Sequence, residues 1–187
     1  MLIGARSLQK GDTLIEVLFA VTVFSLVAVG ALSIMNSSIA TAQRALEISL
    51  VREQMDAQAE ALRYIHDSYV AAYPNPTAGQ PSGEWSKIIA NQISQASTFG
   101  TCAPPNEAFI INTSTVKLEN RSAITSNVQT YSQLRLLPVV SAEGLWVEAV
   151  KADNLNKYVD FQIRACWYSL GLSSPMTLGT IVRLYEP

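Results

Sequence analysis

Apolar residues dominate a long run close to the amino terminus. No charged residue occurs in residues 17–43, a stretch of 27 residues. A helix over residues 14–35 would be about 33 Å long, which is enough to cross a hydrocarbon layer of about 30 Å. A cleavable secretory signal has a shorter apolar region and a small-residue cleavage site, and the sequence offers neither. The pattern therefore predicts one membrane-spanning helix, within residues 12–40.

The residues before this helix indicate its orientation. Arg6 and Lys10 are the only charged residues among residues 1–11. Positive residues beside a membrane span favour the cytoplasmic side. We therefore expect a single-pass protein of the cytoplasmic membrane, with its amino terminus in the cytoplasm and residues 41–187 outside.

A second helical pattern continues directly from the first, over residues 41–73. No proline interrupts residues 12–73. Apolar positions recur at steps of three and four residues, with Gln58 filling the one gap: Ile48, Val51, Met55, Leu62, Ile65, Tyr69 and Ala72. Such a stripe forms either a coiled-coil seam or a face laid on a core. The globular region that follows favours packing within the same chain.

Residues 74–106 are expected to form a linker and one short helix. Prolines and glycines in residues 74–83 end the long helix. The next helix is predicted to place Trp85, Ile88, Ile89, Gln92, Ile93 and Ala96 on one side. Ser82 is its expected amino-terminal cap.

Residues 107–187 have the pattern of a β-sheet domain. Strands are predicted over residues 108–112, 115–119, 128–137, 144–151, 158–168 and 178–185. In the clearest of them, Val159, Phe161, Ile163, Ala165 and Trp167 alternate with Tyr158, Asp160, Gln162, Arg164 and Cys166. Turn signals, such as the one at residues 142–144, separate the strands without long helices between them. The predicted fold is α+β, with the long helix packed on an antiparallel sheet.

Composition and charge narrow the classes of function. Apolar residues make up 49% of the chain and charged residues 15%, which excludes intrinsic disorder. Without the leader the chain carries 11 basic and 15 acidic residues, so nucleic acid is not an expected partner. His66, the one histidine, lies among charged residues and is expected to be a solvated helix residue. No catalytic residue, cofactor site or metal site is predicted, and the chain is not expected to be an enzyme.

Two further groups of residues have a structural interpretation. Asp153, Asn154, Asn156 and Asp160 lack the spacing of a calcium loop, and a turn is the favoured interpretation. Cys102 and Cys166 are the only cysteines, and both are predicted outside the cytoplasm. A disulfide is favoured there over two buried thiols. The tryptophans are expected in the core.

Glu16 is an acid inside the apolar run. A carboxylate within a spanning helix costs a few kcal/mol, unless it reaches the headgroups or meets a positive partner. Cutting the chain after Gly11 would create an amino group on Asp12, about one helical turn from Glu16. In a parallel bundle with an axial offset, the amine of one chain meets the carboxylate of the next.

This stretch resembles the type IV prepilin cleavage and methylation motif. Lys10 and Gly11 end a basic leader, and the segment TLIEV opens an apolar helix. The resemblance covers roughly the first 35 to 40 residues. It implies cleavage after Gly11 by a prepilin peptidase and N-methylation of Asp12. It also implies that Glu16 sets the register between subunits during assembly.

The resemblance implies a structural subunit of a pilus or of a pseudopilus. Its expected partners are other pilin subunits, the prepilin peptidase, an inner-membrane assembly platform, and membrane lipid before assembly. The sequence departs from the family at Asp12, where an apolar residue is usual, and at Ser33, where proline is common. These departures favour a minor pilin or pseudopilin. The alternative is an uncleaved, single-pass, signal-anchored binding domain outside the cytoplasm.

Overall fold

The computed structural model describes residues 12–98, 102–151 and 157–187. Contacts divide the chain into two compact units, Met1–Ala45 and Leu46–Pro187. The second unit is called the head below. The leader with Gly11, residues 99–101, and Asp153, Asn154 and Asn156 of the predicted turn lie outside the described residues.

One long helix, α1 (Asp12–Ala72), accounts for both helical patterns of the sequence. Within the head, its apolar stripe lies in the core: Val51, Met55, Ala59, Leu62 and Ile65 are each at most 4% exposed. The stripe is therefore a face packed on the core of the head, which is the alternative that the sequence favours over a coiled-coil seam.

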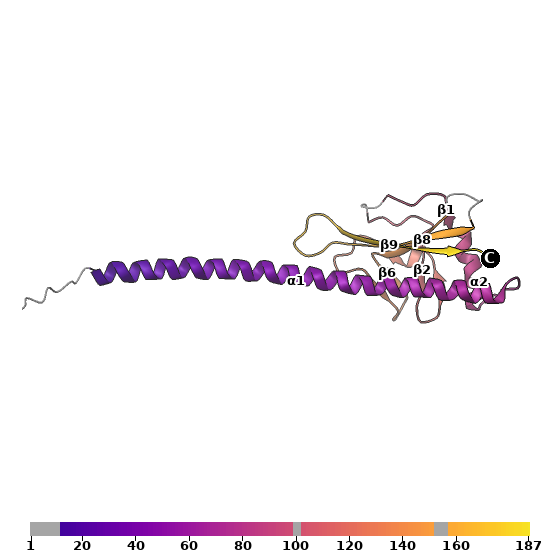
Figure 1. Ribbon diagram of the computed structural model, residues 1–187, viewed down its shortest axis with the longest axis horizontal. Helices are drawn as coiled ribbons and strands as arrows, with labels where there is room; N and C mark the ends of the chain where they lie inside the picture. Colours follow the sequence, from indigo (N-terminus) through magenta and orange to yellow (C-terminus); the bar gives the residue numbers. More distant parts are fainter. Residues whose placement is uncertain (1–11, 99–101, 152–156) are drawn as a thin grey trace, which may run out of the picture. The chain divides into compact units, whose positions relative to one another are not determined.

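The main sheet of the head has four strands in the order β1-β7-β8-β9. Strands β7 (Leu145–Val150), β8 (Tyr158–Trp167) and β9 (Met176–Tyr185) pair antiparallel. Figure 1 labels β8 and β9 of this sheet. The short strand β1 (Gln92–Ile93) joins β7 in parallel. The five odd-numbered residues of β8 are at most 1% exposed, which agrees with their predicted inward direction. The fold is α+β, as predicted.

Two small sheets complete the head. Strands β2 (Ile110–Asn112) and β3 (Lys117–Glu119) form one of them. Strands β4 (Ile124–Thr125), β6 (Ser141–Glu143) and β5 (Gln133–Arg135) form the other, and the 3-10 helix Arg121–Ala123 precedes β4. Trp85, Trp146 and Trp167 are at most 3% exposed, so all three are core residues.

The short helix α2 (Pro81–Ala90) corrects two predictions. Gln80, not Ser82, occupies the cap position, because Pro81 is already in the first turn. The Ser82 hydroxyl instead accepts a hydrogen bond from the backbone N–H of Thr77 at 3.3 Å. Gln92 and Ile93 belong to β1 rather than to the helix, because pairing with β7 satisfies their backbone groups.

The predicted turn at residues 142–144 is also wrong in part. Ala142 and Glu143 belong to β6, and the chain bends only at Gly144, where φ is +62°. A Cβ atom there would lie 2.2 Å from the carbonyl oxygen of Cys166, so the bend requires glycine.

Gln58 attaches α1 to β2 in the middle of the core. Its side chain is 0% exposed. The Nε2 group donates to the carbonyl of Ile111 at 2.7 Å, and the N–H of Ile111 donates to Oε1 at 2.8 Å. The amide group of Gln58 therefore satisfies both backbone groups of Ile111 within the core.

We expect Gln58→Leu to lower the free energy of unfolding by about 3 kcal/mol. Leucine fills a similar volume but leaves the N–H and C=O of Ile111 buried without partners. Denaturant unfolding of the detergent-solubilised chain measures the change. Gln129→Leu, at an exposed position, is the matched control and should change the stability by less than about 0.5 kcal/mol. Equal effects of the two substitutions would contradict the prediction.

Candidate assembly segment

Residues 14–45 of α1, called the assembly segment here, expose apolar side chains on all sides. Their exposed fractions range from 43% at Val23 to 75% at Leu26. The large apolar residues concerned are Leu14, Ile15, Val17, Leu18, Phe19, Val21, Val23, Phe24, Leu26, Val27, Val29, Leu32, Ile34, Met35 and Ile39. A helix that is apolar all round is stable only inside a membrane or among other apolar helices.

Five hydroxyl groups of this segment form hydrogen bonds within the helix. Thr22 donates to the carbonyl of Phe19 at 2.8 Å, and Ser25 donates to that of Val21 at 2.7 Å. The same pattern of bonds to carbonyls three or four residues earlier holds for Ser37, Ser38 and Thr41. Apolar surroundings leave no water for such groups, and internal bonds remove the cost of burying them.

Glu16 is the one charged residue in residues 14–43. Its side chain is exposed, and among the described residues it has neither a hydrogen-bond partner nor an ion-pair partner. Asp12 begins α1, one turn before Glu16. When apolar groups surround Glu16, its carboxylate therefore requires a positively charged partner from another molecule.

By length and composition, one helix in the described part of the chain qualifies as a membrane span. Its most apolar window has a mean hydropathy of 2.5 and no buried residue. This observation agrees with the prediction of one apolar helix near the amino terminus that is long enough to span a membrane.

The comparison with protein families agrees with these features. A family described as the prokaryotic N-terminal methylation motif matches residues 6–32. Over these residues the chain has the amino-terminal segment of a type IV pilin-like protein. The match includes Gly11, Asp12 and Glu16 and most of the apolar segment, and it ends before the head begins. No curated protein and no solved structure matches the chain.

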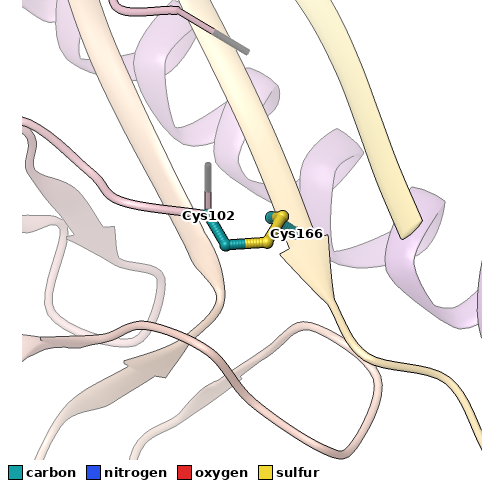
Figure 2. The surroundings of a disulfide bond; sticks show 2 residues. All are labelled: Cys102 and Cys166. Carbon is teal, nitrogen blue, oxygen red and sulfur yellow. A yellow bond between two sulfur atoms is a disulfide. The ribbon is translucent and has the colours of Figure 1, made fainter. Parts of the chain in front are cut away.

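The head of this pilin-like chain contains a disulfide between Cys102 and Cys166, shown in Figure 2. The two Cα atoms are 5.3 Å apart, and the residues are 64 positions apart in the sequence. Both are at most 2% exposed. The bond attaches Cys102 to the carboxyl-terminal end of β8, where Cys166 immediately precedes Trp167.

A buried polar cluster on β7 and β8 was not predicted from the sequence. Glu148 is 1% exposed, and its carboxylate accepts hydrogen bonds from the indole of Trp146 at 2.8 Å and from the backbone N–H of Ser97 at 2.9 Å. Arg164 lies 3.5 Å from the same carboxylate and donates to the carbonyl of Ser97 at 2.6 Å. The cluster holds the segment before residue 99 against the sheet.

The even-numbered residues of β8 are more buried than the sequence predicts. Their alternation with the apolar odd-numbered residues predicted that they face away from the core. Arg164 is nevertheless only 6% exposed and Cys166 only 1%, because the segments around residues 97 and 102 cover that face. An arginine and an acid on neighbouring strands were the available signal, but strand pairing is not evident from sequence alone.

The prediction of a solvated His66 is wrong. Its side chain is 13% exposed, and its ring lies edge-on to Trp85 with centroids 5.0 Å apart. The Nε2 atom donates to the carbonyl of Tyr185 at 2.8 Å. His66 therefore attaches α1 to the end of β9. In residues 12–98, 102–151 and 157–187, no group of three metal-ligating side chains comes together.

Proposed function

We propose that the protein is a structural subunit of a type IV pilus-like filament. It is inserted in the cytoplasmic membrane, cut after Gly11 by a prepilin peptidase, and methylated at Asp12. It then leaves the membrane for a filament held together by its apolar helix. Among pilin-like proteins it is best described as a minor pilin or pseudopilin. Its location is first the membrane and then an extracellular pilus or a pseudopilus of the periplasm or cell wall.

One observation carries this proposal above the others. The methylation motif matched at residues 6–32 overlaps the assembly segment, which exposes apolar side chains and contains one acid, Glu16, without a partner among the described residues. A membrane anchor alone requires the apolar side chains but has no use for the acid. An assembling helix uses both features, because the acid selects one register among many equivalent apolar contacts.

The partners follow from the steps of this assembly. Arg6 and Lys10 keep the leader on the cytoplasmic side, where the peptidase removes it. Moving the helix from lipid to a bundle of pilin helices changes its surroundings little, so extraction has a small burial cost. The new ammonium group at Asp12 of one subunit pairs with Glu16 of the next. An inner-membrane platform would drive the extraction.

The assignment as a minor pilin or pseudopilin rests on two residues at which the chain differs from the usual motif. Asp12 adds a carboxylate beside the new amino group, which weakens the attraction of that amine for Glu16 of a neighbour. Ser33 stands where the family commonly has proline, and α1 continues through it as regular helix. Both features suit a subunit present in few copies.

Mass analysis of the amino terminus tests the proposal. In cells that contain a prepilin peptidase, we expect a mature chain that begins at Asp12 and carries one additional methyl group. A Gly11→Val variant should remain full length, because a branched side chain replaces the glycine of the motif. A wild-type chain that still begins at Met1 would refute the proposal and favour the uncleaved anchored domain.

A further inference from the structure

Strand β9 is the last strand of the main sheet, and its backbone register can be read from two hydrogen bonds. The N–H of Glu186 donates to the carbonyl of Lys157, and the N–H of Cys166 donates to the carbonyl of Gly144. In an antiparallel ladder the bonded pairs alternate. Even-numbered residues of β9 therefore bond to β8, while the N–H and C=O groups of odd-numbered residues point away from β8.

Along residues 177–183 the outward-directed residues form an open edge, called the β9 edge below. At Tyr185 the outward carbonyl already accepts a hydrogen bond from His66. The residues concerned, all of them exposed, are Thr177, Gly179, Ile181 and Arg183. Among the described residues, no backbone hydrogen bond occupies this edge. Ile181 and Tyr185 are each 62% exposed, so the side chains along the edge also present apolar surface.

Between residues 177 and 183, the β9 edge lacks several of the features that usually prevent strand addition. Natural edges are protected by short length, bulges, prolines or unpaired charges. Here the ten residues pair with β8 in one unbroken register, and the strand contains neither proline nor lysine. Its single charge, Arg183, is bound by both carboxylate oxygens of Asp160 at 2.7 and 2.8 Å. These hydrogen bonds raise the pKa of Arg183, and the pair is neutral as a unit.

We propose that the β9 edge adds an extended strand from a neighbouring pilin-like subunit. The inference rests on the proposed function and names a contact within that filament. Backbone N–H and C=O groups in a row are complementary to another extended polypeptide. The neutral edge, with Ile181 and Tyr185 exposed, suits a strand with uncharged side chains. A depression over Gly179, lined by Gln162, Arg164 and Ile181, accepts one of those side chains.

The partner strand is not β9 of a second copy. Two β9 edges can pair symmetrically through their odd-numbered residues only if the strands run antiparallel. In a parallel pair, the bonding residues of one strand lie opposite the non-bonding residues of the other, so two identical edges in the same register cannot bond. Antiparallel pairing would turn one head end for end relative to the other. Subunits of one filament enter from the same membrane with the same polarity, so the contact is between different surfaces. Such heterologous contacts generate open helical assemblies.

Residue-resolved hydrogen exchange provides the first test, on the full chain in detergent and on assembled filaments. We expect the amides of Thr177, Ile181 and Arg183 to exchange roughly 10-fold or more slowly in the filament. The amides of Leu178, Thr180 and Val182 serve as internal controls, because they bond to β8 in both states. Equal exchange of the odd-numbered amides in both states would overturn the inference.

A proline substitution provides the second test. Proline is tolerated at an edge position whose N–H faces solvent, so Ile181→Pro should fold but present one donor fewer and a blocked edge. We expect its incorporation into filaments to fall by roughly 10-fold. Ile181→Thr keeps the N–H and the strand propensity and should assemble as the wild type does. Normal assembly of folded Ile181→Pro would overturn the inference, and if that variant does not fold, the exchange comparison decides.

These outcomes are separable from failure of the proposed function. If no filament contains the protein, the proposed function fails before the edge is tested. If filaments form and the β9 edge remains open to exchange, only the inference about the edge fails.

Discussion

Replacing Glu16 with glutamine is expected to stop filament assembly without affecting membrane insertion. Glutamine has nearly the same shape but cannot attract the ammonium group of a neighbouring Asp12. Removing one partner of a buried ion pair leaves the other charge uncompensated, at a cost of about 3 kcal/mol or more. That cost corresponds to roughly 100-fold in the equilibrium of each contact. Membrane insertion should be unchanged, because the apolar residues around position 16 remain.

The experiment compares the amounts of protein in the membrane and in sheared filaments. Glu53→Gln is the matched control, because it removes one exposed carboxylate from the same helix, outside the apolar segment. We expect that variant to assemble normally. Undiminished filament yield with Glu16→Gln would contradict the role given to this acid, whatever the processing of the leader.

Removing the disulfide is expected to cause the largest loss of stability in the head. The bond between Cys102 and Cys166 closes a long loop and restricts the unfolded chain, which contributes about 4 kcal/mol in the chain-entropy description. For a head of this size the melting temperature should fall by about 10 °C. Thermal unfolding of the full chain in detergent measures the change in a Cys102→Ala/Cys166→Ala variant.

Single and double substitutions distinguish the cross-link from ordinary packing. Either Cys102→Ala or Cys166→Ala removes the bond completely. We therefore expect each single variant to lose nearly as much stability as the double variant. Small losses that add up in the double variant would show that the two side chains contribute only through packing.

Several features of the head could be predicted from local pattern. The spacing of apolar residues in α1 predicted which face is buried, since helical periodicity depends on sequence alone. Alternation in β8 predicted its inward residues for the same reason. Gln58 occupied the one polar position in the helical stripe, and its partner Ile111 could not be inferred because it lies 53 residues away.

Other features depended on contacts between distant segments. His66 appeared solvated from its neighbours in sequence, but Trp85 and the carbonyl of Tyr185 enclose it in the fold. The Glu148 and Arg164 cluster required the pairing of β7 with β8 and the return of Ser97 to the sheet. Ala142 and Glu143 looked like a turn because small and polar residues beside a glycine usually form one.

The sequence by itself determined the assembly segment, which matches a methylation motif and marks the chain as pilin-like. That segment is a helix whose apolar surface and single acid are properties of consecutive residues, and it needs no partner within the chain to be recognised. Only the tertiary structure decided the surface of the head. Which residues are covered, and which edge of the sheet stays open, depends on strand order, and strand order arises from hydrogen bonds between residues far apart in the chain.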